Sequence, residues 1–291
     1  MNIIKNLRNN KNYNKYIDGI KTIILDNSGT FVDPYVIAPA ITFKKVFSNY
    51  MINITMEEAR VPMGLRKDLH IAEILKIPRI RDKFFEKYGR DSNNEDIMNI
   101  YNDFVPTQLQ ILPEYCELLP KVKETMDILK MDGIKIGTTT GFNREMVNCI
   151  VEEVKKKGIE FDNTVAGDDF HHEYLHLGVR PKPFMLYKNL FELDSWPIQS
   201  VVKVDDTICG IQEGISAGCW SVGITDYSNY MNINSLDEWA SLNDVEKYER
   251  KKKSRNKIKE ESGAHYVINE FDQLIPVIQD INKRLIKGEK P

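Results

Sequence analysis

Short apolar runs recur along the chain, and stretches with helical periodicity separate most of them. Six runs have the length and composition of buried strands: Thr22–Leu25, Ile134–Thr138, Asn163–Ala166, Val201–Val204, Trp220–Ile224 and Tyr266–Ile268. Helical patterns lie between them, for example at Lys121–Lys130 and Arg144–Lys157. Strands that alternate with helices indicate a parallel sheet covered on both faces. We therefore predict an α/β fold built on a Rossmann-like parallel sheet.

The interval between the first two strands breaks this alternation, because helical signals fill it throughout. Thr55-Met56-Glu57-Glu58 and Ser92-Asn93-Asn94-Glu95 both have the spacing of a capping box, a sequence signature of a helix N-terminus. Apolar residues at helical spacing follow the second box. We predict a helical cap domain at residues 33–117, inserted into a catalytic core formed by residues 21–32 and 118–285.

The bulk composition limits the classes of partner. The 291 residues include 43 acidic and 40 basic side chains, for a net charge of −3, so no overall field favours nucleic acid or a membrane surface. No apolar run reaches the ~20 residues of a transmembrane helix. The four cysteines contain no C-x-x-C pair, which is typical of reduced thiols. We expect a cytoplasmic protein that binds neither nucleic acid nor membrane.

Two basic segments have alternative interpretations. Residues 1–17 hold four basic side chains, no acid and no apolar core of a secretory signal. We predict a flexible tail at residues 1–20, with an organelle address as the alternative. The basic run at residues 250–257 is flanked by acidic sequence, so it predicts a solvated helix face rather than a nucleic-acid patch.

The first strand ends on a carboxylate, Asp26, and small polar residues follow it. In open parallel sheets, ligands bind at the carboxyl ends of the strands. Gly29 would let backbone amides approach an anion closely. A carboxylate at this place can attack an electrophile such as phosphorus and become an acyl phosphate. A plain turn aspartate is the alternative interpretation of this short motif alone.

Three later strand ends carry matching chemistry. Thr138, Thr139 and Thr140 end the second strand with hydroxyls that can hold a phosphoryl oxygen, and Arg180 provides a fixed cation before a helix. Asp205 and Asp206 end another strand with carboxylates suited to Mg²⁺. Nucleophile, hydroxyl, cation and acid in this order resemble the four motifs of the haloacid dehalogenase superfamily. The resemblance implies an aspartate nucleophile, Mg²⁺ and a mobile cap inserted after the nucleophile loop.

Ser28 occupies the position where phosphomonoesterases of that superfamily usually carry a second aspartate, which protonates the leaving alcohol. A poor alkoxide leaving group would therefore lack an acid. Lys67 and His70 are three residues apart and share a helix face. A lysine imine would create an electron sink, so that carbon can leave phosphorus as an enamine. An exposed lysine beside a helical histidine is the alternative interpretation of this spacing alone.

The segment around Lys67 carries a closer resemblance. Its pattern E-A-R-x-P-M-G-L-x-K-x-x-H, at residues 58–70, resembles the cap signature of the phosphonoacetaldehyde hydrolases, or phosphonatases. The similarity covers roughly residues 20–270. It implies hydrolysis of the carbon–phosphorus bond of phosphonoacetaldehyde to acetaldehyde and phosphate, with Mg²⁺, in a homodimer that forms through the cap.

The resemblance also implies roles for individual residues. Asp26 would be the nucleophile and Lys67 the Schiff-base lysine, with a pKa lowered by burial and by Arg66 or Arg180, while His70 and Met63 would assist the imine chemistry. The residues expected to bind the phosphoryl group or the rest of the substrate are Thr139, Gly141, Arg180, Asn27 and Gly64. Those expected to bind Mg²⁺ are Asp26, Ser28 through its carbonyl, Asp206 and Asp205.

Three departures from the family pattern stand out. The family's nucleophile loop resembles D-W-A-G-T, where this chain has Asn27 and Ser28. The fourth motif resembles G-D-T-x-x-D, where this chain has Asp205 at the first position and Gly210 at the last, so we expect Asp205 to compensate for the lost acid. An insertion at residues 170–178 contains H-E-x-x-H, which binds zinc only on a helix with a third ligand. We predict an ordinary loop there, with a metalloprotease or another metal site as alternatives.

Two other functions fit the same motifs. A Mg²⁺-dependent phosphatase of the superfamily would keep the chemistry of Asp26 and use Lys67 only as a cation that binds another phosphate ester. A non-catalytic relative would bind a phosphonate or a protein partner, which is an interpretation motivated by Gly210. Activity with Mg²⁺ separates the third function from the first two, and imine formation separates those two from each other.

Overall fold

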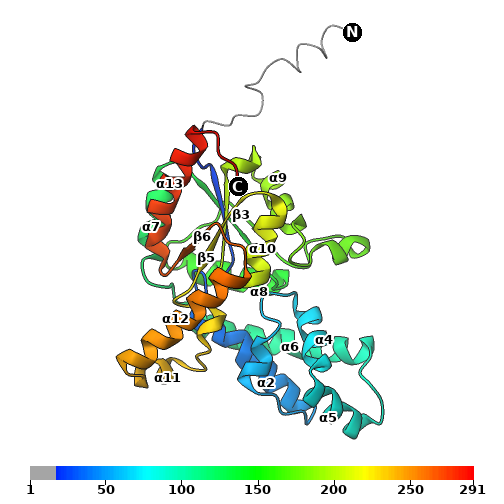
Figure 1. The fold of residues 1–291 in the computed structure, drawn as a ribbon. Helices are drawn as coiled ribbons and strands as arrows, with labels where there is room; N and C mark the ends of the chain where they lie inside the picture. The colour runs from blue at the N-terminus through cyan, green and yellow to red at the C-terminus, as the bar shows by residue number, and fades with distance from the viewer. Residues whose placement is uncertain (1–17) are drawn as a thin grey trace.

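The computed structural model describes residues 18–291 and contains one six-stranded parallel sheet (Figure 1). The predicted tail therefore lies almost wholly outside the described residues. The strands follow the order β3-β2-β1-β4-β5-β6 across the sheet. Their bounds are β1 (Thr22–Leu25), β2 (Lys135–Thr139), β3 (Asn163–Val165), β4 (Val201–Asp205), β5 (Trp220–Ile224) and β6 (Tyr266–Ile268). The predicted α/β fold with a Rossmann-like parallel sheet is confirmed.

Helices cover both faces of the sheet. Helices α9 and α10 lie on one face, and α7 and α13 lie together on the other (Figure 1). Two neighbouring residues of β1 pack on opposite faces of the sheet. Ile23 and Ile24 are both fully buried but belong to different hydrophobic clusters. The helices after the second strand are α7 (Val122–Met131), α8 (Arg144–Lys155), α9 (Phe184–Glu192), α10 (Ile208–Ala217), α11 (Leu236–Ser241), α12 (Asp244–Glu261) and α13 (Leu274–Ile286).

The long interval after β1 folds into five helices that gather at one end of the sheet (Figure 1). They are α2 (Ile37–Asn49), α3 (Met56–Arg60), α4 (Lys67–Lys76), α5 (Pro78–Tyr88) and α6 (Asn94–Ile111). Six short 3-10 helices complete the described chain: η1 (Pro34–Val36), η2 (Leu112–Tyr115), η3 (His172–Leu177), η4 (Ile198–Ser200), η5 (Asn229–Met231) and η6 (Phe271–Gln273).

The two predicted capping boxes differ in outcome. Thr55 and Glu58 exchange hydrogen bonds at the start of α3, as expected. At α6 the box consists of Asn93 and Asp96, one residue later than predicted. The shift arises because the side-chain oxygen of Asn93 accepts hydrogen bonds from two backbone N–H groups of the first helical turn.

The chain passes from the β1 loop to α2 through three non-glycine residues with left-handed backbone conformations. Their φ angles are 51° at Asp33, 66° at Tyr35 and 54° at Val36. Such conformations cost about 1–3 kcal/mol each and persist only where surrounding contacts enforce them. Asp33 contributes such contacts, because its Oδ1 accepts hydrogen bonds from the N–H groups of Ile37 and Ala38 at 3.0 and 3.1 Å. The connection therefore has a strained backbone that the hydrogen bonds of Asp33 hold in place.

The basic run at residues 250–257 lies within α12, where Ser254 and Ile258 are buried and Lys252 and Lys253 are exposed. Among the described residues, no helix combines the length and the apolar composition that a membrane crossing needs.

Candidate active site

The carboxyl ends of β1, β2 and β4 meet the loop before α4 around a small cavity. Its volume is about 20 Å³, which is room for about one water molecule. The residues that line it are Asp26, Ser28, Val36, Pro39, Met63, Gly64, Lys67, Thr140, Gly141, Phe142, Arg180, Asp206 and Thr207. Most of the residues predicted from the sequence to form a site are thus brought together at one place.

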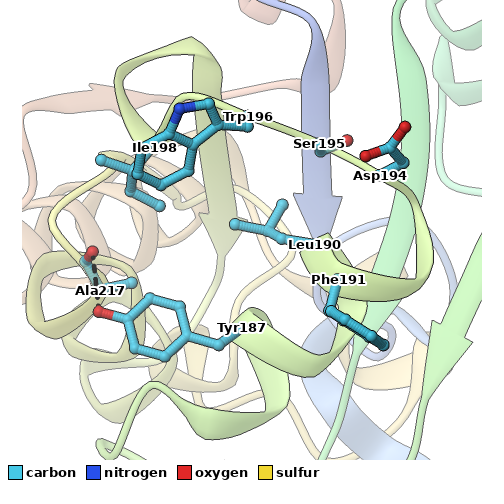
Figure 2. A pocket seen from close by; sticks show the side chains of 8 residues that line it. All are labelled: Tyr187, Leu190, Phe191, Asp194, Ser195, Trp196, Ile198 and Ala217. Carbon is cyan, nitrogen blue, oxygen red and sulfur yellow. Dashed lines mark hydrogen bonds between the residues drawn. The ribbon is translucent and has the colours of Figure 1, made fainter.

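A larger cavity of about 510 Å³ lies between α9 and the loop before β4 (Figure 2). Its walls are mainly the apolar side chains Leu190, Phe191, Trp196 and Ile198. The hydroxyl of Tyr187 donates to the carbonyl of Ala217 at 3.2 Å and is thereby satisfied. Because no convergent charged groups line this larger cavity, chemistry identifies the smaller one as the candidate site.

Three carboxylates converge beneath the small cavity. One oxygen from each of Asp26, Asp205 and Asp206 lies within 4.8 Å of the others, and all three side chains are buried. Burial, followed by the charges of Asp205 and Asp26, raises the pKa of Asp206 well above its usual range. Burial and Asp205 likewise raise the pKa of Asp26 to about 6. Three acids this close repel one another unless a cation lies between them.

A buried ionic network surrounds these acids. Arg180 Nη1 lies 2.8 Å from Asp26 Oδ1, and Arg180 Nε lies 3.1 Å from Glu213 Oε2. Lys203 Nζ lies 3.1 Å from Asp205 Oδ2 and 3.5 Å from Glu213 Oε2. Sequence reasoning missed Lys203 and Glu213. The signal for Lys203 was a charged residue in the middle of an apolar strand, since a buried ammonium requires a partner.

The charges of this network fit a divalent cation. The network and the acid cluster together hold four carboxylates but only two cations, Arg180 and Lys203. Asp206 Oδ1 also lacks a hydrogen-bond partner in the described structure, whereas Asp205 Oδ2 lies 3.1 Å from Lys203 Nζ and 3.4 Å from Arg180 Nη2. An unpaired carboxylate oxygen and four carboxylates against two cations suit a hard cation such as Mg²⁺, which prefers oxygen ligands. The donor set therefore fits the metal that the sequence predicts.

The structure distinguishes the two threonines that end β2. Thr139 Oγ1 donates to Glu213 Oε2 at 3.0 Å and accepts from Lys203 Nζ at 2.9 Å, inside the ionic network. It does not line the cavity, whereas Thr140 does. Side chains alternate between the two sides of a strand, so a shift by one residue exchanges these environments. For the expected phosphate-binding role of Thr139, the geometry therefore favours Thr140, which lines the cavity.

The two residues that follow Asp26 differ in their position relative to the cavity. Ser28 lines the cavity, and its Oγ lacks a partner in the described structure. Asn27 is not among the lining residues. Its carbonyl instead accepts hydrogen bonds from the N–H groups of the turn that follows, with N···O distances of 3.1–3.4 Å. The predicted contact of Asn27 with substrate therefore has no support in this geometry, and the residue shapes the loop.

Gly210 is explained by Asp205. A Cβ at position 210 would lie 1.9 Å from Asp205 Oδ2, far closer than two non-bonded heavy atoms can approach. The carboxylate of Asp205 is fixed there by two hydrogen bonds to its Oδ1, from the N–H of Thr207 at 2.9 Å and from Thr207 Oγ1 at 2.7 Å. The carboxylate of Asp205, at the end of β4, thus occupies the space that a side chain at position 210 of α10 would need.

Lys67 faces the acids from the opposite side of the cavity. Its Nζ lies 4.8 Å from the ring centre of Phe142 and 5.8 Å from that of Phe43. Burial, and to a smaller extent the charge of Arg180, lowers the pKa of Lys67 to about 8 against the opposing effect of Asp26. Of the two cations expected to lower it, Arg180 does so, whereas the guanidinium of Arg66 pairs with Asp68 at 2.8 Å.

His70 lies beside Lys67 on α4 and is completely buried. Its Nε2 lies 2.8 Å from the carbonyl oxygen of Ala59, which requires a proton on Nε2. Its ring stacks on Phe43 with ring centres 4.0 Å apart. Burial and the charge of Lys67 hold the pKa of His70 well below its usual range. The neutral ring therefore has a free lone pair on Nδ1, which lacks a partner in the described structure.

Two predicted glycines allow the loop before α4 to close on the sheet. A Cβ at Gly64, where φ is +97°, would lie 2.4 Å from Cys209 Sγ. A Cβ at Gly141 would lie 2.4 Å from the carbonyl oxygen of Leu65. Met63, a lining residue of the same loop, accepts a hydrogen bond from Cys209 Sγ at 3.6 Å through its carbonyl. Both glycines line the cavity, and both are sites of close approach between loop and core.

The H-E-x-x-H segment forms a 3-10 helix, η3, rather than an α-helix. The zinc-binding form of this pattern needs an α-helix that carries both histidines on one face. Among the side chains that the structure describes, the cluster of acids or histidines that could hold a metal is the one formed by Asp26, Asp205 and Asp206. The metalloprotease alternative therefore has no structural support.

Comparisons with known proteins agree on one family. Residues 23–224 match the haloacid dehalogenase-like hydrolases. The phosphonoacetaldehyde hydrolase of Paraburkholderia phytofirmans is 38% identical over 272 residues, which cover 94% of this chain and 99% of that protein. The enzyme of the same name from Bacillus cytotoxicus is 38% identical over 265 residues, which cover 91% and 97%.

Solved structures show the same relationship. A phosphonoacetaldehyde hydrolase-like protein from Oleispira antarctica superposes with a TM-score of 0.89 at 34% identity, and the match covers 95% of this chain and 98% of that one. A β-phosphoglucomutase from Clostridium difficile shares the fold at 18% identity, with a TM-score of 0.63 over 92% of this chain and 99% of its own.

Proposed function

The chain belongs to the haloacid dehalogenase-like hydrolases and, within them, to the phosphonoacetaldehyde hydrolases, and we propose that it cleaves phosphonoacetaldehyde to acetaldehyde and phosphate. The observation that carries this proposal is that Asp26 and Lys67 line the same closed cavity. A carboxylate on one side can attack phosphorus, and an amine on the other can bind the aldehyde carbon. This pairing suits a substrate that carries both groups on adjacent carbons.

The first step joins substrate and lysine. Neutral Lys67 attacks the aldehyde carbon, one amine proton and one proton from solvent convert the carbonyl oxygen to water, and a protonated imine forms as that water leaves. The low pKa of Lys67, about 8, makes the neutral amine available near neutral pH. The free lone pair of His70 Nδ1 can accept a hydrogen bond during this step, while burial and the charge of Lys67 keep the pKa of His70 low and the ring neutral. Met63 and Phe142 line the cavity and limit the access of water.

The second step breaks the carbon–phosphorus bond. A carboxylate oxygen of Asp26 forms a bond to phosphorus, and the electron pair of the carbon–phosphorus bond moves into the imine, which becomes a neutral enamine. Arg180, with Nη1 2.8 Å from Asp26, and Thr140 would hold the phosphoryl oxygens. Protonation of the enamine carbon and hydrolysis of the imine release acetaldehyde. Water then cleaves the aspartyl phosphate and frees phosphate.

Mg²⁺ is the metal that we propose for the acid cluster. Asp26, Asp205, Asp206 and the carbonyl of Ser28 would hold it. When bound, the cation would offset the negative charges that otherwise oppose the approach of a phosphonate to Asp26. Asp205 then has two tasks, because it also balances the charges of Arg180 and Lys203.

Access to the site requires movement. A cavity of about 20 Å³ cannot admit a phosphonate, so the loop before α4 must withdraw for substrate to enter. We propose that residues 33–117 act as a cap that opens about the strained connection at Asp33, Tyr35 and Val36. We also propose a homodimer through this cap, which exposes large apolar side chains such as Met51 and Phe85, and a cytoplasmic location, in which the four free cysteines would stay reduced.

The two rival functions remain distinguishable by experiment. A phosphate-ester hydrolase is favoured only if another acid replaces the missing aspartate at Ser28. The non-catalytic alternative loses its main motivation, because Asp205 fills the space next to Gly210. The deciding measurement is phosphate release from phosphonoacetaldehyde and from a panel of phosphate monoesters, with and without Mg²⁺. Release from the monoesters alone would replace the proposal with the phosphatase, and no release from any compound would favour the binding protein.

A further inference from the structure

Arg60, at the end of α3, connects the helices α2–α6, here called the helical layer, to the core through buried hydrogen bonds. Its side chain is only 5% exposed. Nη1 donates to the carbonyl of Tyr35 at 2.5 Å and to Asn229 Oδ1 at 3.1 Å, and Nη2 donates to the carbonyl of Ile233 at 2.5 Å. Burial lowers the pKa of Arg60 only to about 10, so the guanidinium stays charged at neutral pH.

Asn229 completes a reciprocal contact with Arg60. Its side-chain Oδ1 accepts from the guanidinium, and its Nδ2 donates to the backbone carbonyl of Arg60 at 3.2 Å. We call these two hydrogen bonds the Arg60–Asn229 clasp. The backbone N–H of the same Asn229 donates to Asp206 Oδ2 at 2.8 Å. One residue therefore contacts both the helical layer and a carboxylate of the acid cluster.

Arg60 also stabilises the strained connection between the core and the helical layer. Tyr35, whose φ is 66°, accepts from Arg60 through its carbonyl, and Val36, whose φ is 54°, accepts from the same Nη1 at a longer 3.4 Å. Without these hydrogen bonds, the left-handed backbone would lose an interaction that enforces it. Arg60 thus ties together the connection, the loop that closes the cavity and the neighbour of Asp206.

We propose that Arg60 and Asn229 are positioning residues that couple closure of the cap to binding of a divalent cation at Asp206. This inference rests on the proposed function for its metal and its mobile cap. When the clasp is formed, the N–H of Asn229 donates to Asp206 Oδ2 and holds the carboxylate in one orientation. Coupling of this kind is reciprocal, so the cation must favour the closed cap to the same degree that the closed cap favours the cation.

The test measures cation affinity and closure without substrate. Asn229→Ala removes the clasp but keeps the backbone N–H that contacts Asp206, and Arg60→Lys keeps the charge but loses the forked geometry. Calorimetry gives the dissociation constant of Mg²⁺, and amide hydrogen exchange reports closure at residues 33–36 and 61–66. We expect Mg²⁺ to slow exchange in both segments of the unmodified protein. Each variant should bind Mg²⁺ about fivefold to tenfold more weakly and lose most of that protection.

A matched control is Arg79→Lys, because Arg79 binds Glu58 and the carbonyl of Asn53 within the helical layer only. This variant should keep both the affinity and the protection. The double variant of Arg60 and Asn229 should be no weaker than the weaker single one, since both changes break the same unit.

The outcomes separate this inference from the function on which it rests. Unchanged Mg²⁺ affinity and protection in Asn229→Ala would overturn the coupling and leave the proposed reaction intact. If Arg60→Lys does not fold, Asn229→Ala alone decides. If the unmodified protein binds no Mg²⁺, both the proposed coupling and the proposed metal are overturned. If the coupling is measured as expected but the unmodified protein does not cleave the phosphonate, only the proposed reaction is overturned.

Discussion

The carboxylate of Asp205 occupies the space that a side chain at position 210 would need, with its Oδ2 1.9 Å from the place of a Cβ at Gly210. Position 205 lies at the end of β4 and position 210 in the first turn of α10, so one acid can reach the cluster from either element but not from both. Aspartate at 205 therefore requires glycine at 210.

This relationship predicts that the effects of two substitutions depend on each other. Gly210→Asp alone should lower the free energy of unfolding by about 3 kcal/mol or more, because it adds a clash and a buried charge. Asp205→Gly alone should weaken Mg²⁺ binding and leave Arg180 and Lys203 short of a counter-charge. The double variant should recover much of both properties. Thermal unfolding and Mg²⁺ calorimetry on all four proteins measure this, and additive effects would contradict the account.

Asp26→Asn tests the nucleophile. The substitution keeps the shape of the side chain but removes the attacking charge, so turnover should fall by about a thousandfold or more. The variant should stay folded, because it also removes one of three crowded carboxylates. Phosphate release and circular dichroism provide the two measurements. If more than about a tenth of the turnover is retained, covalent catalysis by Asp26 is excluded.

Lys67→Arg separates cleavage of a phosphonate from cleavage of an ester. Arginine keeps a positive charge but forms no imine, so phosphonate cleavage should be lost almost completely. In the unmodified protein, borohydride with acetaldehyde should inactivate the enzyme and attach two carbons to Lys67, as mass spectrometry can show. Lys76→Arg, on the exposed side of the same α4, is the matched control and should change neither result. Good cleavage by Lys67→Arg without any adduct would favour the ester hydrolase.

The pKa of Lys67 predicts how imine formation depends on pH. Since burial lowers this pKa from its usual value to about 8, the amine is protonated below pH 8 and neutral above it. Adduct formation with acetaldehyde and cyanoborohydride should therefore rise about tenfold per unit between pH 6 and 7.5 and level off above about pH 8.5. An exposed lysine would continue to gain reactivity up to about pH 10. A profile of that second kind would show that Lys67 is not buried as described.

The two threonines of β2 should respond differently to the same substitution. Thr140→Val removes a hydroxyl from the cavity, so the inhibition constant of phosphate should rise about tenfold with little change in stability. Thr139→Val removes hydrogen bonds to Glu213 and Lys203 inside the ionic network. It should lower the free energy of unfolding by about 1–3 kcal/mol. The reverse assignment would restore Thr139 as the phosphate ligand that the sequence suggested.

The sequence predicted the sheet well because its strands are buried on both faces and read as continuous apolar runs. Thr22–Leu25 and Trp220–Ile224 match the observed strands, and the second strand is displaced by one residue. Register on this scale depends on packing against neighbouring strands, which a local pattern does not contain. The choice between Thr139 and Thr140 had another basis, because the family resemblance pointed to Thr139, whereas Thr140 lines the cavity.

The parts of the site that escaped prediction all depend on contacts distant in sequence. Arg60 and Asn229 are 169 residues apart and meet only in the folded chain. Glu213 reads as one of many helical acids until Lys203 and Arg180 are placed beside it. The compensation between Asp205 and Gly210 was expected from the motif, but its steric basis required the geometry of both elements.

The central place of β1 in the sheet has a consequence for the making of the protein. Leu25 pairs with Thr138 on one side and with Val204 on the other, so the strand is translated long before either partner. At 5–20 residues per second, roughly 10–40 s separate the synthesis of Leu25 and Val204 on a ribosome. During that time the uncharged strand from Thr22 to Leu25 has two open edges, at which nascent chains associate wrongly. The segment that bears Asp26 therefore waits longest for its second partner strand, and the sheet can close around it only after β4 has been made.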